Sequence, residues 1–82
     1  MIDVLYFAWV RERIGHPKDQ VDSSAATVME LVEELRAREP RYEAAFADLD
    51  ALRVAVDQEL TGFDAPLKGA REVAFFPPMT GG

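Results

Sequence analysis

Residues 72–82 read EVAFFPPMTGG, an apolar run that passes without a linker into two prolines and ends on two glycines. The first five residues are typical of a buried strand, because β-branched and aromatic side chains dominate them. The two prolines fix φ and favour an extended path. The two glycines carry no side chain, so a narrow channel in another protein can admit them. The segment therefore predicts an anchored strand followed by a projecting, flexible tail.

A second apolar segment covers residues 2–10. Its apolar side chains fall at both alternating sets of positions, which is typical of a strand in the middle of a sheet. We expect one long strand here, lying parallel to the strand at residues 72–76. Phe75 and Phe76 are adjacent in that last strand and must point to opposite faces, so we expect Phe76 to face outward.

Helical spacing is clearest between these two segments. Thr27 and Glu30 form a capping box, which predicts a helix start. Apolar residues at positions 28, 31, 32 and 35 then fall on one face, and Pro40 is expected to end the helix near Glu39. A second, shorter helix is expected over residues 42–49.

The remaining segments complete the pattern of elements. A helical turn at residues 11–14, strands at residues 18–22 and 52–56, and a short strand at residues 60–61 are expected. This order in a short chain predicts an α+β fold of the β-grasp type, a mixed sheet with one main helix packed on one face. The domain is expected at residues 1–76 and the tail at residues 77–82.

The composition of the chain excludes or disfavours several classes of ligand and reactive site. Nine Lys and Arg against fifteen Asp and Glu give a net charge of −6, which disfavours nucleic acid and favours a partner with a basic surface. The absence of cysteine excludes disulfides, thiolate nucleophiles and Cys-based zinc sites. His16, the single histidine, has no second ligand or orienting group near it in sequence, so no metal or base role is predicted.

The sequence also bears on location. No apolar run approaches the ~20 residues of a membrane span, and the N-terminus lacks the positive start of a signal peptide. We therefore expect a cytoplasmic chain that makes no contact with membranes.

Several motifs together resemble one known family. They are VLYFA at residues 4–8, VAV at residues 54–56 and above all EVAFFPPMTGG at residues 72–82. On these residues the chain resembles the small subunits of molybdopterin synthase, which are ubiquitin-like sulfur carriers. The resemblance runs essentially from end to end.

The resemblance implies a chemical role for the last residue. An activating enzyme would adenylate the carboxylate of Gly82 with ATP, and a sulfur donor would replace AMP to leave a thiocarboxylate. The large subunit of the synthase would then pass the sulfur to cyclic pyranopterin monophosphate, in a heterotetramer of two small and two large subunits. Catalytic residues of the transfer would lie on the large subunit, so no metal or cofactor is expected on this chain.

The resemblance also assigns residues to the partner contact. The tail residues that would thread into the partner are Pro77, Pro78, Met79, Thr80 and Gly81. The apolar contact surface would be formed by Phe7, Leu60 and Phe76.

Two departures from the family pattern are visible. Gly69-Ala70-Arg71 stands where relatives often have Gly-Asp just before Glu72, which is expected to alter a turn and remove one acidic contact. Asp57 stands where asparagine is usual, and it is expected to alter only a turn, since both residues tolerate left-handed conformations.

Three other functions fit the same sequence. A sulfur carrier of the thiamin-thiazole type would use Gly82 in the same way for a different synthase. A ubiquitin-like modifier would join the Gly82 carboxyl group to lysines of target proteins. A passive β-grasp binding module would bind a partner through the apolar face of its sheet, and its terminal glycines would have no chemical role.

Overall fold

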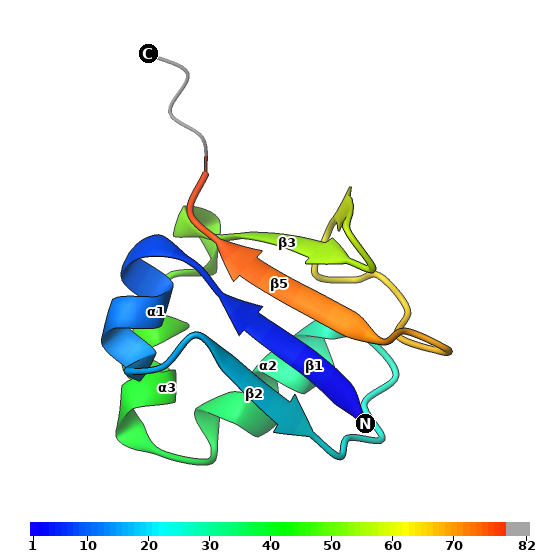
Figure 1. The fold of residues 1–82 in the computed structure, drawn as a ribbon, viewed down its shortest axis with the longest axis horizontal. Helices are drawn as coiled ribbons and strands as arrows, with labels where there is room; N and C mark the ends of the chain where they lie inside the picture. Colours follow the sequence, from blue (N-terminus) through cyan, green and yellow to red (C-terminus); the bar gives the residue numbers. More distant parts are fainter. Residues whose placement is uncertain (79–82) are drawn as a thin grey trace.

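Within residues 1–78, which the computed structural model describes, five strands form one mixed sheet (Figure 1). The strand order is β2-β1-β5-β3-β4, and α2 packs across one face of the sheet. In chain order the elements are β1 (Ile2–Tyr6), α1 (Ala8–Ile14), β2 (Lys18–Val21), α2 (Val28–Arg36), α3 (Pro40–Ala45), the 3-10 helix η1 (Leu49–Ala51), β3 (Arg53–Val56), β4 (Glu59–Thr61) and β5 (Glu72–Phe76).

The middle strand of the sheet is β5. It pairs parallel with β1, where Val4 lies opposite Val73 and Tyr6 opposite Phe75, and antiparallel with β3. The predicted parallel pairing of the first and last strands is therefore confirmed. The bounds of β5 are also those that the sequence predicted, because its neighbours bury the apolar run on both sides.

The hydrophobic core lies between the sheet and the helices. Phe46 and Phe75 are fully buried and meet edge to face, with ring centroids 4.9 Å apart. The apolar stripe predicted for α2 is buried too, at Val28, Leu31, Val32 and Leu35. No helix within residues 1–78 has the length and hydrophobicity needed to cross a membrane.

The first strand is shorter than predicted. Residues 2–10 were expected to form one strand, but β1 ends at Tyr6 and α1 begins at Ala8, whose φ is +54°. Val10 and Ile14 are both buried, and their spacing of four places them on one face of a helix. A short apolar run is compatible with either a strand or a helix. Which of the two it forms is decided by how its side chains are buried in the folded protein.

The start of α2 follows its capping box. Oγ1 of Thr27 accepts a hydrogen bond from the backbone N–H of Glu30 at 3.3 Å, and Oε1 of Glu30 accepts one from Ala26 at 3.4 Å. The backbone N–H of Val28 donates to the carbonyl of Ala65 at 3.0 Å. The loop before β5 thus helps to cap the helix.

The predicted end of this helix was wrong. α2 ends at Arg36, and Pro40 is the first residue of α3 instead of the terminator of α2. Proline suits the first position of a helix, because the N–H it lacks would have no intrahelical partner there. The predicted helix at residues 42–49 accordingly lies at Pro40–Ala45, and Leu49 belongs to η1.

A tight turn at Asp57 and Gln58 joins β3 to β4 and also holds the start of β5. Both residues have positive φ, of 50° and 70°. Oδ1 of Asp57 accepts hydrogen bonds from the backbone N–H groups of Arg71 and Glu72, each at 3.0 Å. Asp57 therefore does more than shape its turn, because it fixes the segment that leads into the middle strand. Gly69, in the turn before β5, takes a left-handed φ of 77°.

We expect Asp57→Ala to lower the free energy of unfolding by about 1–2 kcal/mol, because two N–H groups lose their acceptor and alanine disfavours positive φ. Asp57→Asn keeps an acceptor oxygen and tolerates the same φ, so it should cost no more than about 0.5 kcal/mol. Urea denaturation of both variants measures the difference, with the exposed Asp22→Ala as the matched control. Equal losses for alanine and asparagine would contradict the assigned role of Oδ1.

Candidate functional site

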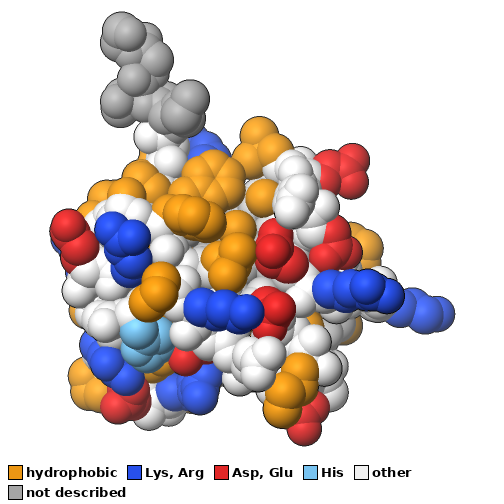
Figure 2. Space-filling view, in the orientation of Figure 1, with side chains coloured by type: hydrophobic (Ala, Val, Ile, Leu, Met, Phe, Trp, Pro, Cys, Tyr) orange, Lys and Arg blue, Asp and Glu red, His pale blue; other side chains and the backbone are white. Residues whose placement is uncertain are grey.

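Exposed apolar side chains gather on the face of the sheet that α2 does not cover. Among residues 1–78, Phe7 is 47% exposed and Leu60 is 69% exposed, and Phe76 is half-buried. Figure 2 shows this face, with hydrophobic side chains over the ends of β1 and β5 and towards β4. Large apolar groups exposed together are a mark of a contact surface.

The register of the sheet explains why these side chains share a face. Phe75 is fully buried, so Phe76 points to the other side, as predicted. The backbone N–H of Phe7 donates to the carbonyl of Phe75 at 3.1 Å, which carries the β1–β5 pairing one step beyond Tyr6. Phe7 and Phe76 therefore lie side by side at the end of the two central strands.

Leu60 belongs to the same face but to a different row. It pairs with Ala55 of β3, which in turn pairs with Ala74 of β5. Ala55 and Ala74 have small side chains, so the surface between Leu60 and the two phenylalanines is shallow. We call this surface, made of Phe7, Ala55, Leu60, Ala74 and Phe76, the apolar face.

The base of the tail adjoins the apolar face. Pro77 and Pro78 follow Phe76 directly and are half-buried. The roles predicted for Met79, Thr80, Gly81 and Gly82 fall outside the described residues. The structure thus places the three predicted contact residues on one face of the sheet, with the first two tail residues next to Phe76 at one end of that face.

A polar cluster lies on the opposite face of the sheet, where its two tyrosines are buried and its Asp19 and His16 are partly exposed, and sequence reasoning missed it. The hydroxyl groups of Tyr6 and Tyr42 donate to Oδ2 of Asp19 at 2.9 and 2.7 Å, and Nε2 of His16 lies 2.9 Å from Oδ1. The expectation that His16 has no orienting group was therefore wrong. We call these four residues the Asp19 cluster.

The contacts within the cluster shift the pKa values of Asp19 and of the two tyrosines. Burial acts to raise the pKa of Asp19, but hydrogen bonds from His16, Tyr42 and Tyr6 outweigh it, so the pKa lies below its usual value. Burial and the hydrogen bond to Asp19 raise the pKa of both tyrosines. Since the carboxylate only accepts, each tyrosine must donate and His16 must carry its proton on Nε2. The cluster ties β1, β2 and α3 together.

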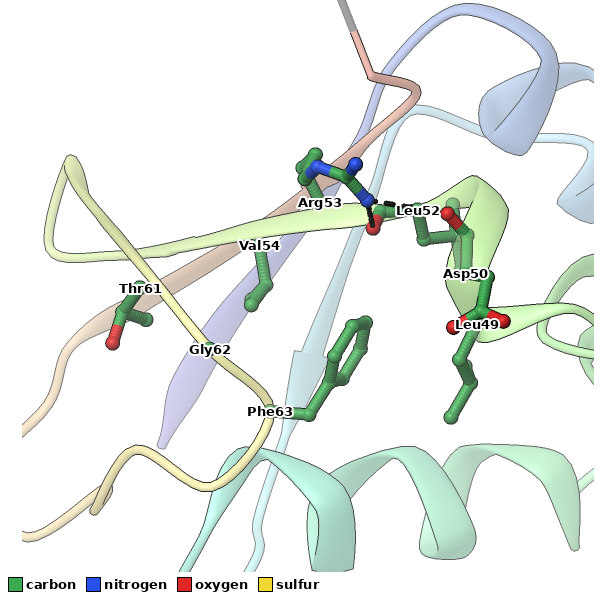
Figure 3. A pocket seen from close by; sticks show the side chains of 8 residues that line it. All are labelled: Leu49, Asp50, Leu52, Arg53, Val54, Thr61, Gly62 and Phe63. Atoms are coloured by element: carbon green, nitrogen blue, oxygen red, sulfur yellow. Dashed lines mark hydrogen bonds between the residues drawn. The ribbon is translucent and has the colours of Figure 1, made fainter.

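Two other features of the described residues bear on ligand binding. No group of three or more potential metal ligands comes together within residues 1–78. An open pocket of about 490 Å³ lies between β3 and the loop after β4 (Figure 3). Its lining residues are Leu49, Asp50, Leu52, Arg53, Val54, Thr61, Gly62 and Phe63. The pocket lacks a cluster of catalytic groups, and we assign no ligand to it.

Known proteins resemble this chain over its full length. Residues 4–82 match the ThiS family. A molybdopterin synthase sulfur carrier subunit from Escherichia coli (strain K12) is 45% identical over 82 residues, and one from Haemophilus influenzae (strain ATCC 51907 / DSM 11121 / KW20 / Rd) is 37% identical, each with complete coverage of both chains.

A solved structure supports the fold. SAMP1 from Haloferax volcanii superposes with a TM-score of 0.77 at 25% identity, covering 99% of this chain and 98% of that one. The predicted β-grasp fold is confirmed by this likeness and by the sheet order. With a match over nearly its whole length and relatives that align from end to end, the chain belongs to the ThiS family, where it groups with the molybdopterin synthase sulfur carrier subunits.

Proposed function

We propose that this chain carries sulfur for molybdopterin synthase on the carboxyl group of Gly82. The observation that supports this most is the end-to-end alignment, at 45% identity, with a protein named for that role. The geometry fits as well, because the middle strand of the sheet runs straight into Pro77 beside the apolar face. A large subunit can cover that face and receive the tail at the same time.

Activation of the carboxylate explains why a carrier of this kind needs ATP. A carboxylate is a poor electrophile, because its negative charge repels nucleophiles. One of its oxygens attacks the α-phosphorus of ATP on the activating enzyme, and pyrophosphate leaves. A sulfur nucleophile such as hydrosulfide then attacks the carbonyl carbon, AMP leaves with the electron pair of the broken bond, and loss of a proton gives the thiocarboxylate.

The second half of the cycle belongs to the large subunit. Its active site would take the Gly82 thiocarboxylate through a channel that Gly81 and Thr80 can enter, and the sulfur would pass to cyclic pyranopterin monophosphate. Two loaded tails supply the two sulfurs of each dithiolene. In this proposal the chain contributes the sulfur and the docking surface and needs no cofactor of its own. We place the cycle in the cytoplasm, where ATP is available.

An intact-mass measurement tests the proposal directly. Incubation with the activating enzyme, ATP and sodium sulfide should raise the mass of the chain by about 16 Da, the exchange of one oxygen for sulfur at an acyl carrier. Omission of ATP is the matched control and should leave the mass unchanged. Transfer of the sulfur to the pterin by the large subunit, with return of the original mass, should complete the cycle.

Other outcomes of this experiment separate the alternatives. Loading followed by transfer only to a thiazole synthase would support the thiamin type of carrier. Recovery of the chain joined to lysines of other proteins would support a modifier. An unchanged mass with ATP and sulfide, together with retained partner binding, would leave the passive binding module.

A further inference from the structure

Arg53 stands beside the base of the tail. It is the partner of Phe76 in the β3–β5 ladder. Directly paired residues project to the same face of a sheet, with Cβ atoms ~5 Å apart. Figure 3 shows the Arg53 side chain directed away from the pocket, on the other side of β3 from Val54. The cation therefore borders the apolar face next to Phe76.

Backbone carbonyls hold this guanidinium in place. Nη1 donates to the carbonyl of Leu52 at 2.8 Å and to that of Asp50 at 3.2 Å (Figure 3). These bonds use only Nη1, and no side chain within residues 1–78 pairs with Nε or Nη2. Arginine presents its remaining N–H groups as a planar fork that matches a carboxylate. An anchored side chain also loses less conformational freedom when it is bound.

The surroundings of Arg53 determine what a protein partner that covers this side chain must supply. The protein has a net charge of −6, yet the side chains next to Arg53 on this face are the apolar Phe76 and, beyond it, Phe7. A partner that covers the two phenylalanines removes water from the guanidinium as well. Burial of a charge is unfavourable unless an acceptor replaces the lost water. The partner must therefore supply that acceptor.

We propose that Arg53 is a specificity-determining contact, and that it pairs with a carboxylate of the synthase large subunit at the mouth of the channel that receives the tail. This inference rests on the proposed function. The overall negative charge attracts a basic partner, whereas Arg53 fixes the register by requiring an acidic group at one point. The apolar face supplies contact area, and Arg53 selects the partner that fits.

Binding to the purified large subunit tests this role. Arg53→Gln should weaken the affinity about tenfold. Arg53→Lys should recover part of the loss, because lysine keeps the positive charge but lacks the planar guanidinium group. The loss in Arg53→Gln should shrink at high salt, which screens a charge pair. In the sulfur transfer assay, KM for the loaded carrier should rise while kcat stays unchanged. Arg36→Gln, on α2 and away from the apolar face, removes the same charge and should bind like the wild type.

The controls separate this contact from a structural role. Arg53 also binds two carbonyls, so thermal unfolding of each variant must be measured alongside the affinity. The inference is overturned if Arg53→Gln binds like the wild type, or if its loss of affinity is independent of salt and Arg53→Lys recovers none of it. Failure of the wild type itself to bind the large subunit would instead overturn the proposed function.

Discussion

Deletion of Gly82 should abolish sulfur loading and leave the fold unchanged. Loss of one residue withdraws the terminal carboxylate by ~3.5 Å from the position that it reaches in the activating enzyme. Even a displacement of about 1 Å can cost on the order of a hundredfold in rate when reacting groups must be aligned. We therefore expect no detectable gain of mass in the loading assay. The core of residues 1–78 does not include the deleted residue, so the melting temperature should stay the same.

A lengthened chain provides the matched comparison. Addition of one glycine after Gly82 keeps every existing residue but converts the reactive carboxylate into an amide and moves the new carboxylate outward. Loading should be lost in this variant too. Binding to the large subunit should persist in both variants, because the apolar face and Arg53 are untouched. Sulfur loading of either variant at the wild-type rate would contradict the assignment of reactivity to the carboxyl group of Gly82.

The middle of the sheet could be predicted from sequence because its signals are local and consistent. Residues 73–76 are apolar, β-branched or aromatic, and two prolines follow them, so the sequence indicated both the strand and its end. Thr27 and Glu30 likewise fixed the start of α2. The outward position of Phe76 followed from strand alternation alone once Phe75 was assigned to the core.

Other elements depended on contacts that no local pattern reveals. Residues 7–10 are all apolar, as in a strand buried on both faces, but Val10 and Ile14 are buried as neighbours on α1. Pro40 is compatible with ending one helix or beginning another, and only the packing of α3 decides.

The missed tyrosine contacts of Asp19 join residues that are far apart in the chain. The Asp19 cluster joins residues from two strands, a helix and a loop, with Tyr42 lying 23 positions from Asp19. The anchoring of Arg53 is local in sequence, at the carbonyls of Asp50 and Leu52, but it depends on the path of the η1 turn. Neither kind of contact is marked by a residue pattern in the sequence.

Replacement of Asp19 should give the largest loss of stability among the single substitutions considered. Asp19→Ala removes the acceptor of two tyrosine hydroxyls and the partner of His16. Tyr6 is 1% exposed and Tyr42 is 2% exposed, whereas the Asp19 side chain is 17% exposed, so water can replace the carboxylate only in part. An unsatisfied buried donor costs about 1–3 kcal/mol, and we expect a loss of about 3 kcal/mol in the free energy of unfolding. For a small domain with a total stability of about 5–15 kcal/mol, this is a large fraction.

The pH dependence of the free energy of unfolding tests whether the Asp19 carboxylate causes this loss of stability. The pKa of Asp19 is lower in the folded protein than its usual value, because hydrogen bonds from His16, Tyr42 and Tyr6 outweigh the effect of burial. A lowered folded pKa contributes stability that is fully present above the unfolded pKa of ~3.9 and is lost as the pH falls through the folded pKa. Tyr6, Tyr42 and His16 face the carboxylate, and the guanidinium groups of Arg38 and Arg41 lie over the Tyr42 ring.

Asp19→Asn separates this titration from packing, because the amide is nearly the same size and cannot ionise. Urea denaturation should show wild type more stable than Asp19→Asn at neutral pH by about 1–2 kcal/mol, with the difference shrinking as the pH falls below ~4. The exposed Asp22→Asn should show no such convergence. A difference between wild type and Asp19→Asn that stays constant down to the acid limit would mean that the cluster stabilises the fold by shape alone, and that the lowered pKa of Asp19 does not exist.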